Sequence, residues 1–433
     1  MVNFPKTTAL YRRVFSHFKS SIKSSSIGSS LEKRHISSMF NNNEKYRPHI
    51  LVIGGAYGGF SVVTNVLNLI EGNPQLSSPL SPPPLEDFKI RTTPRITILD
   101  ERDGIYHTMG SPLAHSKSEF ASEAWRRFDD IPILHRNNVR TIQGKASSID
   151  MASRVATYQE NSTSPLMEIP YDYLVVATGA SRNWPVVPKS TTREEYLQDI
   201  HGHIESLRRS KRVVIVGGGA VGVEFAAEIK ANFPNTEVYL VQSRPHLLHA
   251  EPLPNEFKQR AADILTKMGI QLVLGCRVTK ILDDSTPGFK SMVTLSNGMR
   301  LGADHVIQTN SLHVARTEFL PKKVLDSHGC INVRPTLQFP SDLVNADFHY
   351  AAGDVVSWSG IKRVGNAFIM GQHVATNIYA QPIFDFDLAI YGDITQTQRF
   401  YTLDDGSDSQ WIMKNHGHSH RVTSGAQYEE GYD

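Results

Sequence analysis

The segment KRVVIVGGGAVGVEFAAEI at 211–229 limits the fold of this chain more than any other stretch. Val213–Val216 is a short apolar run, typical of a buried parallel strand. Gly217, Gly219 and Gly222 follow in the spacing G-x-G-x-x-G and open a predicted helix. In such a unit the first glycine permits the turn, the second lets the backbone approach a pyrophosphate, and the third lets the helix pack closely on the strand. The segment therefore predicts a dinucleotide site, with phosphates at the helix N-terminus; a glycine-rich turn between unrelated elements is the weaker alternative.

A second segment, HILVIGGAYGGF at 49–60, repeats this pattern. Ile50–Ile53 is again a short predicted strand. The three motif positions are taken by Gly54, Ala56 and Gly59, and Gly55, Tyr57 and Gly58 lie between them. Two such loops, about a domain's length apart, predict two nucleotides on two linked domains.

Length and cysteine content set limits on the class of protein. The chain has 433 residues, enough for two or three domains. It contains no run of about eighteen apolar residues, so we expect no membrane-spanning helix. Its two cysteines, Cys276 and Cys330, are far apart and form no C-x-x-C motif. This excludes a disulfide scaffold and a redox pair of vicinal cysteines.

Charge is spread unevenly along the chain. Residues 1–46 hold eight Lys/Arg, two acids and ten serines, with no acid before Glu32. Apolar residues recur there at helical spacing, which is the pattern of a mitochondrial transit segment; a basic tail on a cytoplasmic protein is the alternative. Residues 47–433 contain 37 basic and 41 acidic residues, a net charge of −4. This acidic balance argues against nucleic acid as a partner.

An acid is expected where the strand after the first glycine loop ends. The strand predicted at Arg95–Leu99 ends in Asp100. An acid at that place normally binds ribose hydroxyls about 20 residues after the glycines. Here the proline-rich stretch SSPLSPPPLED lengthens the gap, so the prediction requires that stretch to be a surface loop. Two later strands are predicted to end in Thr178-Gly179 and in Gly353-Asp354.

The second glycine loop lacks the corresponding acid. Gln242 stands 20 residues after Gly222, at the end of the strand predicted at Glu237–Val241. Arg244 follows two residues later, and an arginine there can neutralise a 2′-phosphate. We therefore predict NADPH in preference to NADH. The alternative is that Arg244 is an ordinary solvated surface residue.

These elements predict an α/β fold with two Rossmann-like dinucleotide-binding domains, the first of them discontinuous. The predicted organisation is a targeting segment at 1–46, the first domain at 47–189 and 312–380, the second domain at 190–311, and a polar tail at 381–433. The tail contains HGHSH at 416–420, but alternate histidines without other ligands are weak support for a metal, so we predict no metal site.

The order of motifs resembles the FAD/NAD(P)-dependent pyridine nucleotide-disulfide oxidoreductase superfamily, whose fold is glutathione-reductase-like. The motifs are GGAYGG, LDERD, LVVATGA, VGGGAVGVE and AAGD, and together they cover about 49–380. Within the superfamily the chain is most similar to the apoptosis-inducing-factor-like branch, including its fungal members. The features behind that similarity are DGIYHTMGSPLA after the second strand and the lack of C-x-x-C. Ala56, the inserted loop, Asn310 and the tail depart from the family pattern.

The resemblance implies a role for each matching position. Gly54–Gly59 would wrap the FAD pyrophosphate, Asp100 would hold the adenosine ribose, and Ala146 would meet the adenine through its backbone. Thr178 and Gly179 would close the FAD site, Asp354 after Gly353 would bind the ribityl chain, and the helix from Asn366 would point at the flavin pyrimidine ring. Gly217, Gly219 and Gly222 would bind the nicotinamide dinucleotide.

The implied catalytic position is Glu224, beside the nicotinamide ring. The alternative for Glu224 is an early-turn carboxylate that favours the helix dipole. His107, His115 and Lys117 follow the strand that should end near the flavin. Surface or supporting roles are as consistent with their positions as acid–base catalysis.

The function implied is an FAD-dependent NAD(P)H oxidoreductase. Hydride would pass from carbon 4 of the nicotinamide to nitrogen 5 of the flavin, which needs no acid–base residue because the cofactor carries the chemistry. Without paired cysteines, electrons should leave the flavin directly, to a quinone-like small molecule or to oxygen or a protein. Two alternatives are an NAD(P)H-sensing signalling flavoprotein and a reductase of an iron–sulfur protein. The sequence leaves open peripheral membrane contact and the oligomeric state.

Overall fold

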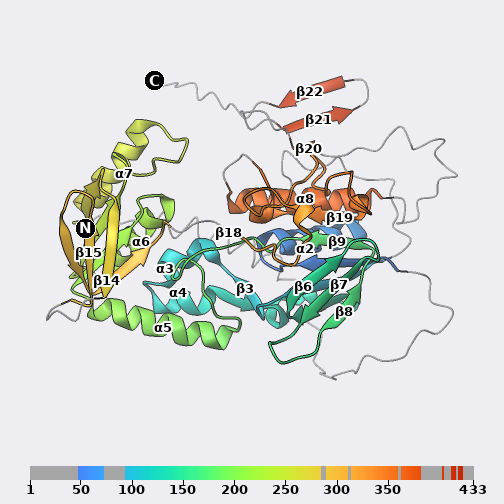
Figure 1. Cartoon of the computed structure of the whole chain (residues 1–433), viewed down its shortest axis with the longest axis horizontal. Coiled ribbons are helices and arrows are strands. Elements are labelled where there is room, and N and C mark those ends of the chain that lie inside the picture. Colours follow the sequence, from blue (N-terminus) through green and yellow to red (C-terminus); the bar gives the residue numbers. More distant parts are fainter. Residues whose placement is uncertain are drawn as a thin grey trace. The chain divides into compact units, whose positions relative to one another are not determined.

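The computed structural model describes residues 47–72, 93–283, 289–310, 314–358 and 362–381, and the backbone of three short strands beyond them. The chain divides into two compact units (Figure 1). The first contains the described residues up to Glu101, Phe128–Ala180, and the described residues from Ala315 onward. The second contains Arg102–Arg127 and Ser181–Val314.

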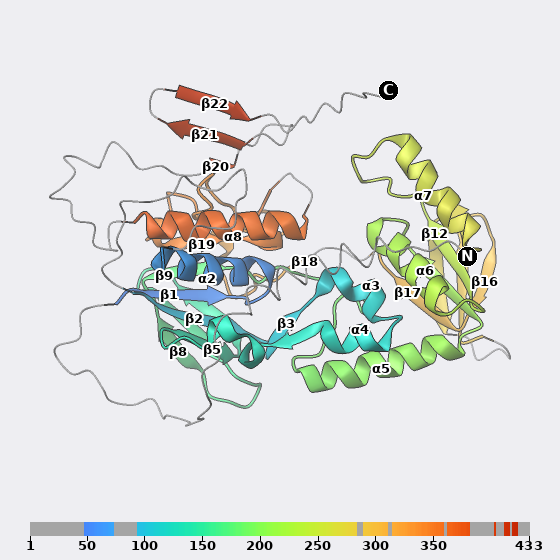
Figure 2. The ribbon, with the colours of Figure 1, turned by 180° about the vertical axis from the view of Figure 1, so that it is seen from behind.

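The first unit is built on a five-stranded parallel sheet with the order β19-β9-β1-β2-β5. The strands are β1 (His49–Ile53), β2 (Arg95–Asp100), β5 (Val139–Gln143), β9 (Tyr173–Val176) and β19 (His349–Ala351). Helices α2 (Tyr57–Ile70) and α8 (Val364–Tyr379) lie side by side next to this sheet (Figures 1 and 2). A Cβ on Gly371 of α8 would lie only 2.6 Å from the Gly58 carbonyl oxygen, so glycine permits this close packing.

An antiparallel sheet completes the regular structure of the first unit. It consists of β6 (Lys145–Asp150), β7 (Val155–Gln159) and β8 (Met167–Pro170). Five 3₁₀ turns of this unit are η2 (Phe128–Asp130), η3 (Pro132–Leu134), η4 (Lys322–Val324), η5 (Ala346–Phe348) and η6 (Gly353–Val355). Short β10 (Ala180–Ser181) and β18 (Val314–Ala315) pair where the chain passes from one unit to the other.

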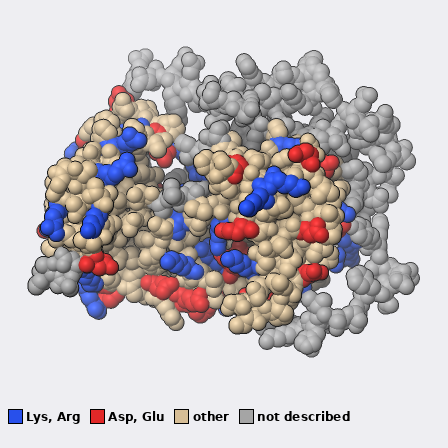
Figure 3. Space-filling view, viewed as in Figure 1, with Lys and Arg blue, Asp and Glu red and all other residues tan. Residues whose placement is uncertain are grey.

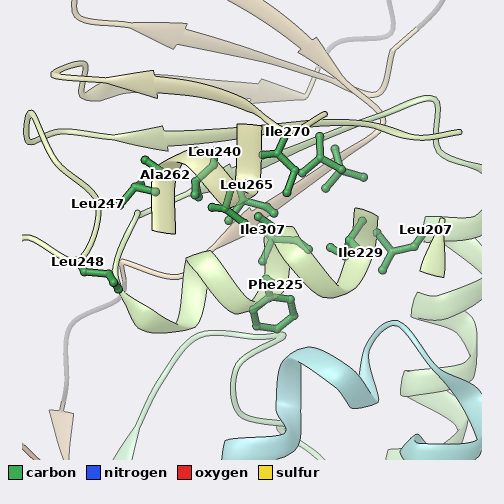
Figure 4. Packing of buried hydrophobic residues seen from close by; sticks show 14 of the residues in the cluster. Leu207, Phe225, Ile229, Leu240, Leu247, Leu248, Ala262, Leu265, Ile270 and Ile307 are labelled. Atoms are coloured by element: carbon green, nitrogen blue, oxygen red, sulfur yellow. The ribbon is translucent and has the colours of Figure 1, made fainter. Parts of the chain in front are cut away.

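The second unit has its own parallel sheet, with the order β13-β12-β11-β17. Its strands are β11 (Arg212–Val216), β12 (Glu237–Gln242), β13 (Gln271–Leu274) and β17 (His305–Gln308), and an antiparallel sheet adds β14 (Val278–Asp283), β15 (Ser291–Leu295) and β16 (Arg300–Ala303). Helices α6 (Ala220–Asn232) and α7 (Asn255–Lys267) cover the parallel sheet. Phe225 and Ile229 of α6 meet Leu265 of α7 and Ile307 of β17 in the core (Figure 4). The predicted α/β fold with two Rossmann-like sheets is confirmed.

The segment Arg102–Arg127 belongs to the second compact unit. The predicted domain limits placed it with the rest of 47–189 in one domain. It contains β3 (Gly104–Tyr106), η1 (Thr108–Gly110), α3 (Ser111–Ala114), α4 (Ser118–Glu123) and β4 (Trp125–Arg127). Buried Tyr106 and Trp125 pack on Tyr196 of α5 (Arg193–Arg209), which draws this segment into the second unit. The division into compact units does not show which nucleotide each domain binds. FAD binding by the first domain and NAD(P)H binding by the second therefore stay predictions.

The prediction overlooked α5, although its start carries a local signal. The Thr192 hydroxyl accepts from the Glu195 N–H at 3.2 Å, and the Glu195 carboxylate accepts from the Thr192 N–H at 3.2 Å. This reciprocal pair is a capping box, recognisable in sequence as Thr-x-x-Glu.

Several predicted segments lie outside the described residues. These are the targeting segment at 1–46, the proline-rich stretch between α2 and β2, and residues 416–417 of HGHSH. In the predicted tail, the backbone forms β20 (Thr402–Leu403), β21 (Trp411–Asn415) and β22 (His418–Val422), an antiparallel arrangement that the prediction did not include. Among the described residues, no helix combines the length and apolar character needed to cross a membrane.

Buried imidazoles form a cluster in the second unit. His203 of α5 meets His115 after α3 with 4.6 Å between ring centroids, and His305 of β17 with 4.7 Å. Trp184 packs against both His115 and His203. Burial, followed by the nearby His305 imidazole, lowers the pKa of His203 to about 3. Burial with the neighbouring imidazoles holds the pKa of His115 well below 6.5. The folded protein therefore keeps these rings neutral.

This cluster predicts acid sensitivity of the fold. The unfolded chain binds protons on these histidines below about pH 6.5, and the folded chain does not, so stability is present above that pH and falls as the pH drops towards the folded pKa. Each such histidine should cost about 1.4 kcal/mol per pH unit in that window. Thermal unfolding of His203→Leu between pH 7 and pH 4 should show a shallower pH slope than the wild type. Exposed His201→Leu on the same helix is the control; equal slopes in all three proteins would contradict the assignment.

Candidate dinucleotide-binding sites

The first glycine loop lies at the carboxyl end of β1. Gly54 has φ +98°, and a Cβ there would lie 2.5 Å from the Ala177 carbonyl oxygen. A Cβ on Gly59 would overlap the Gly54 carbonyl oxygen itself. Both positions accept only glycine. Gly54 has a left-handed backbone, and Gly59 lies where the helix touches the loop too closely for a side chain. The predicted strand–turn–helix unit is present in full.

Helix α2 begins in a way that suits an anion. Its N-cap is Ala56, and an alanine has no side-chain acceptor for the first-turn N–H groups. Helix α5 begins differently, since its N-cap Thr192 accepts from the Glu195 N–H through its side chain. No side chain of the N-cap residue covers the start of α2, and a phosphate is the group that such helix starts bind.

Asp100 occupies the predicted place at the end of β2. Ile53 of β1 is aligned with Leu99 of β2, so the proline-rich stretch does not shift the register between the two strands. The Gly55 N–H donates to Asp100 Oδ2 at 2.7 Å. The carboxylate therefore lies directly at the glycine loop, where an adenosine ribose is expected.

Arg316, which the sequence did not indicate, connects the residues that follow β9 with the residue that follows β2. The Thr178 hydroxyl donates to the Arg316 carbonyl at 2.6 Å, and the Arg316 N–H donates to the Gly179 carbonyl at 3.1 Å. The Arg316 guanidinium forms an ion pair with Glu101, next to Asp100. Most of these contacts use the Arg316 backbone, which has no sequence signature.

The fourth strand end brings Gly353 and Asp354 to the same edge. Gly353 has φ +82°, and the Ala352 carbonyl oxygen lies 3.4 Å from where a Cβ of Gly58 would be. Gly353 and Asp354 line a pocket together with Asn366 in the first turn of α8. The start of α8 and the Gly-Asp turn thus share one concave surface, as the prediction of a flavin beside them requires.

Ala146 lies on β6, within the antiparallel sheet. It is paired with Tyr158 of β7 and is 8% exposed. A register shift follows it, between Ala146 and Ser148. Its proposed backbone contact with adenine stays a prediction.

The second glycine loop repeats the first with one informative difference. Gly217 has φ +113°, and a Cβ on Gly222 would overlap the Gly217 carbonyl oxygen. A Cβ on Gly219, in contrast, would meet no described atom within 4 Å. Gly219 is therefore dispensable for packing, and the open space above it fits a closely approaching pyrophosphate.

The chain leaves β17 beside this loop. The Thr309 hydroxyl lies 3.0 Å from the Gly217 carbonyl oxygen, to which it donates. Asn310, which departs from the family pattern, is not among the described non-glycine residues with positive φ. The turn therefore differs from that at Gly179, whose φ is +65°.

Gln242 takes the place that Asp100 has in the first unit. The Gly218 N–H donates to Gln242 Oε1 at 3.3 Å, and the Ser243 N–H donates to the same atom at 3.1 Å. The side chain of Arg244 is exposed, while its carbonyl accepts from the Gly275 N–H at 3.0 Å. The acid is thus replaced by an amide already bonded within the loop, with a solvent-facing guanidinium two residues on.

Glu224 is exposed on the second turn of α6. The first turn of α6 contains no acid, so Glu224 lies one turn beyond the helix start, where the helix dipole acts less strongly on a carboxylate. A place beside the nicotinamide stays a prediction.

The other candidates do not come together as an acid–base site. His115 is fully buried among aromatic rings, and burial lowers the pKa of His107 to about 4. Lys117 is exposed. Among the described residues, no group of three or more His, Cys, Asp or Glu is placed to hold a metal ion.

Several known proteins are similar to this chain in sequence or fold. A family model described as pyridine nucleotide-disulphide oxidoreductase matches residues 48–371. The chain is 38% identical to oxidoreductase OXR1 of Ajellomyces capsulatus over 77% of its own length and 73% of that protein's. It is 25% identical to ferroptosis suppressor protein 1 of Mus musculus, over 67% and 70% of the two chains. Its fold is similar to that of an engineered water-forming NADPH oxidase bound to NADPH, with a TM-score of 0.58 at 19% identity over 76% and 69%.

Proposed function

The chain belongs to the pyridine nucleotide-disulphide oxidoreductase family, and from that premise we propose that it passes electrons from NADPH through FAD to a quinone-like small molecule without a redox-active disulfide. It is an oxidoreductase that uses FAD and NAD(P)H. The observation that carries the proposal is the pair of glycine loops, one per unit, each with two positions that accept only glycine. When bound, the two cofactors supply the hydride chemistry, and the chain supplies binding and orientation.

The apoptosis-inducing-factor-like branch is the placement that we propose within the family. It rests on DGIYHTMGSPLA after β2, and it is supported by the similarity to OXR1 and to ferroptosis suppressor protein 1.

Direct transfer from flavin to acceptor is supported by the positions of the cysteines. Cys276 follows β13 in the second unit, Cys330 belongs to the first unit, and the sequence has no other cysteine. Two lone thiols give no support to a dithiol next to the flavin.

The proposal is tested with the purified full-length protein. NADPH should bleach the visible flavin band without oxygen, and an added quinone should restore it faster than a disulfide or a ferredoxin does. Cys276→Ser leaves a single cysteine, so no intramolecular disulfide can form, and the quinone rate should stay unchanged. Loss of quinone reduction in that variant, or faster reoxidation by a disulfide, would contradict direct transfer.

NADPH preference is proposed from the surroundings of Gln242. No carboxylate repels a 2′-phosphate there, and Arg244 presents a planar fork that matches phosphate oxygens. The substitutions in the engineered NADPH oxidase include aspartate to alanine followed directly by alanine to arginine. That change removes an acid and adds an arginine. This chain likewise has an amide, Gln242, in place of the acid, and an arginine, Arg244, close after it.

Arg244→Ala should therefore raise KM for NADPH by about tenfold and leave KM for NADH nearly unchanged. A charge-assisted phosphate contact contributes about 1.5–3 kcal/mol, and exposure of the side chain favours the lower end. Steady-state kinetics with both donors measures this, with exposed Arg260→Ala on α7 as the matched control. A wild type that prefers NADH, or equal weakening of both donors in Arg244→Ala, would refute the assignment.

We propose a small molecule, not nucleic acid, as the partner. On the face seen in Figure 3, Lys and Arg are interspersed with Asp and Glu. A nucleic-acid site would favour clustered basic residues.

Mitochondrial targeting by residues 1–46 stays a proposal that rests on composition. A fluorescent reporter fused after residue 46 should accumulate in mitochondria. A diffuse cytoplasmic signal would contradict the proposal.

A further inference from the structure

Lys362 lies just before α8 and is bonded to the turn that carries Asp354. Its Nζ donates to the Asp354 carbonyl at 2.6 Å, to the Val356 carbonyl at 3.1 Å, and to Cys330 Sγ at 3.4 Å. An ammonium group has three N–H donors. Three acceptors thus match all three donors, and the charge is directed into the protein.

The turn held by Lys362 has a shape that needs support. It begins at Gly353, whose φ of +82° is left-handed, and passes through the single 3₁₀ turn η6. Inside the turn, the Val356 N–H donates to the Gly353 carbonyl at 3.1 Å. The Asp354 carbonyl accepts from the Lys362 ammonium group, which belongs to a residue outside this turn.

The third partner of Lys362 is itself firmly placed. The Cys330 N–H donates to Asp326 Oδ1 at 2.9 Å, and the Asp326 N–H donates to the Cys330 carbonyl at 2.8 Å. The Ser357 hydroxyl donates to Asp326 Oδ2 at 2.6 Å, just beyond the turn. The Ile331 N–H reaches the Val355 carbonyl at 2.9 Å. Lys362 therefore connects the Gly353–Val356 turn to a fixed neighbouring segment.

We propose that Lys362 is a positioning residue for FAD, which acts through Asp354 and not by its own contact with the cofactor. This rests on the proposed role of Asp354 in FAD binding. Lys362, Asp354 and Asn366 line the same pocket, so a shift of the turn alters the surface that faces the flavin site. Loss of the ammonium leaves two turn carbonyls without their charged donor, and the turn can then rotate Asp354 away from its productive orientation.

The role predicts how two substitutions combine. Lys362→Met keeps most of the unbranched apolar side chain and removes all donors. It should weaken FAD binding about tenfold, the effect of losing one charge-assisted contact. Lys362→Arg keeps charge and donors and should restore most of the affinity. In a double variant with Asp354→Ala, FAD affinity should equal that of Asp354→Ala alone, because Lys362 acts only through that residue.

FAD dissociation constants are measured from the fluorescence of released flavin, together with the melting temperature of each apoprotein. Exposed Lys323→Met in η4 is the matched control and should bind FAD like the wild type. The role of Lys362 would be overturned if the double variant bound FAD more weakly than Asp354→Ala alone. It would also be overturned if Lys362→Met bound FAD like the wild type while Asp354→Ala lost flavin. Full flavin occupancy in Asp354→Ala would instead overturn the proposed role of Asp354 in FAD binding, on which the role of Lys362 rests.

Discussion

Gly222→Ala should abolish reduction of the flavin by NADPH while FAD stays bound. A Cβ at this position would overlap the Gly217 carbonyl oxygen, and the Thr309 hydroxyl would lie 2.8 Å away. Room can be made only by moving α6 off β11, which opens the packing of Phe225 and Ile229 against the sheet. Overpacking of this kind costs about 1–3 kcal/mol or more. The displaced loop would also lose the close approach that a pyrophosphate requires.

Gly219→Ala is the matched control for this substitution. Its Cβ would enter open space, and its φ of −75° suits any residue, so the melting temperature should stay unchanged. Flavin reduction followed by stopped flow should show a higher KM for NADPH in Gly219→Ala and no reduction in Gly222→Ala. Flavin content gives the second readout, since FAD is assigned to the other unit. Normal reduction kinetics in Gly222→Ala would mean that this loop does not hold the nicotinamide dinucleotide.

Asp100→Ala should release most of the FAD on dilution. The carboxylate accepts from the Gly55 N–H at 2.7 Å and is expected to hold the adenosine ribose as well. Hydrogen bonds to a charged group contribute about 1.5–3 kcal/mol each, so losing them should weaken FAD binding by about a hundredfold or more.

Gel filtration with absorbance of the flavin band measures the FAD that remains bound. Asp100→Asn keeps an acceptor for the Gly55 N–H and should retain more FAD than Asp100→Ala does. Exposed Asp129→Ala should behave like the wild type. Full flavin retention in Asp100→Ala would remove Asp100 from the site.

The glycine loops could be predicted from sequence because their causes are local. A left-handed φ at Gly54 and Gly217, and a helix start within a few residues, are decided by neighbouring atoms of the chain. Asp100 was also predictable, although an insertion precedes it, because β1 and β2 align by their own apolar residues.

What escaped prediction depends on contacts between distant residues. The assignment of Arg102–Arg127 to the second unit depends on Tyr106 and Trp125 packing against Tyr196. The role of Arg316 depends mainly on backbone groups, which are the same in every residue. The positions of His203 and His305 in one buried cluster follow from the packing of a helix on a sheet, and no spacing along the chain encodes it.

The order of strands in the first sheet has a consequence for biosynthesis. Strand β19, which ends next to Asp354, is added at the sheet edge only after the ribosome has made the whole of Ser181–Val314. Domains generally fold as units while the chain emerges from its N-terminus. The interrupting segment can therefore fold before the sheet that it interrupts is complete. Flavin capture then belongs among the last steps of maturation, and a nascent chain stalled before β19 should be colourless.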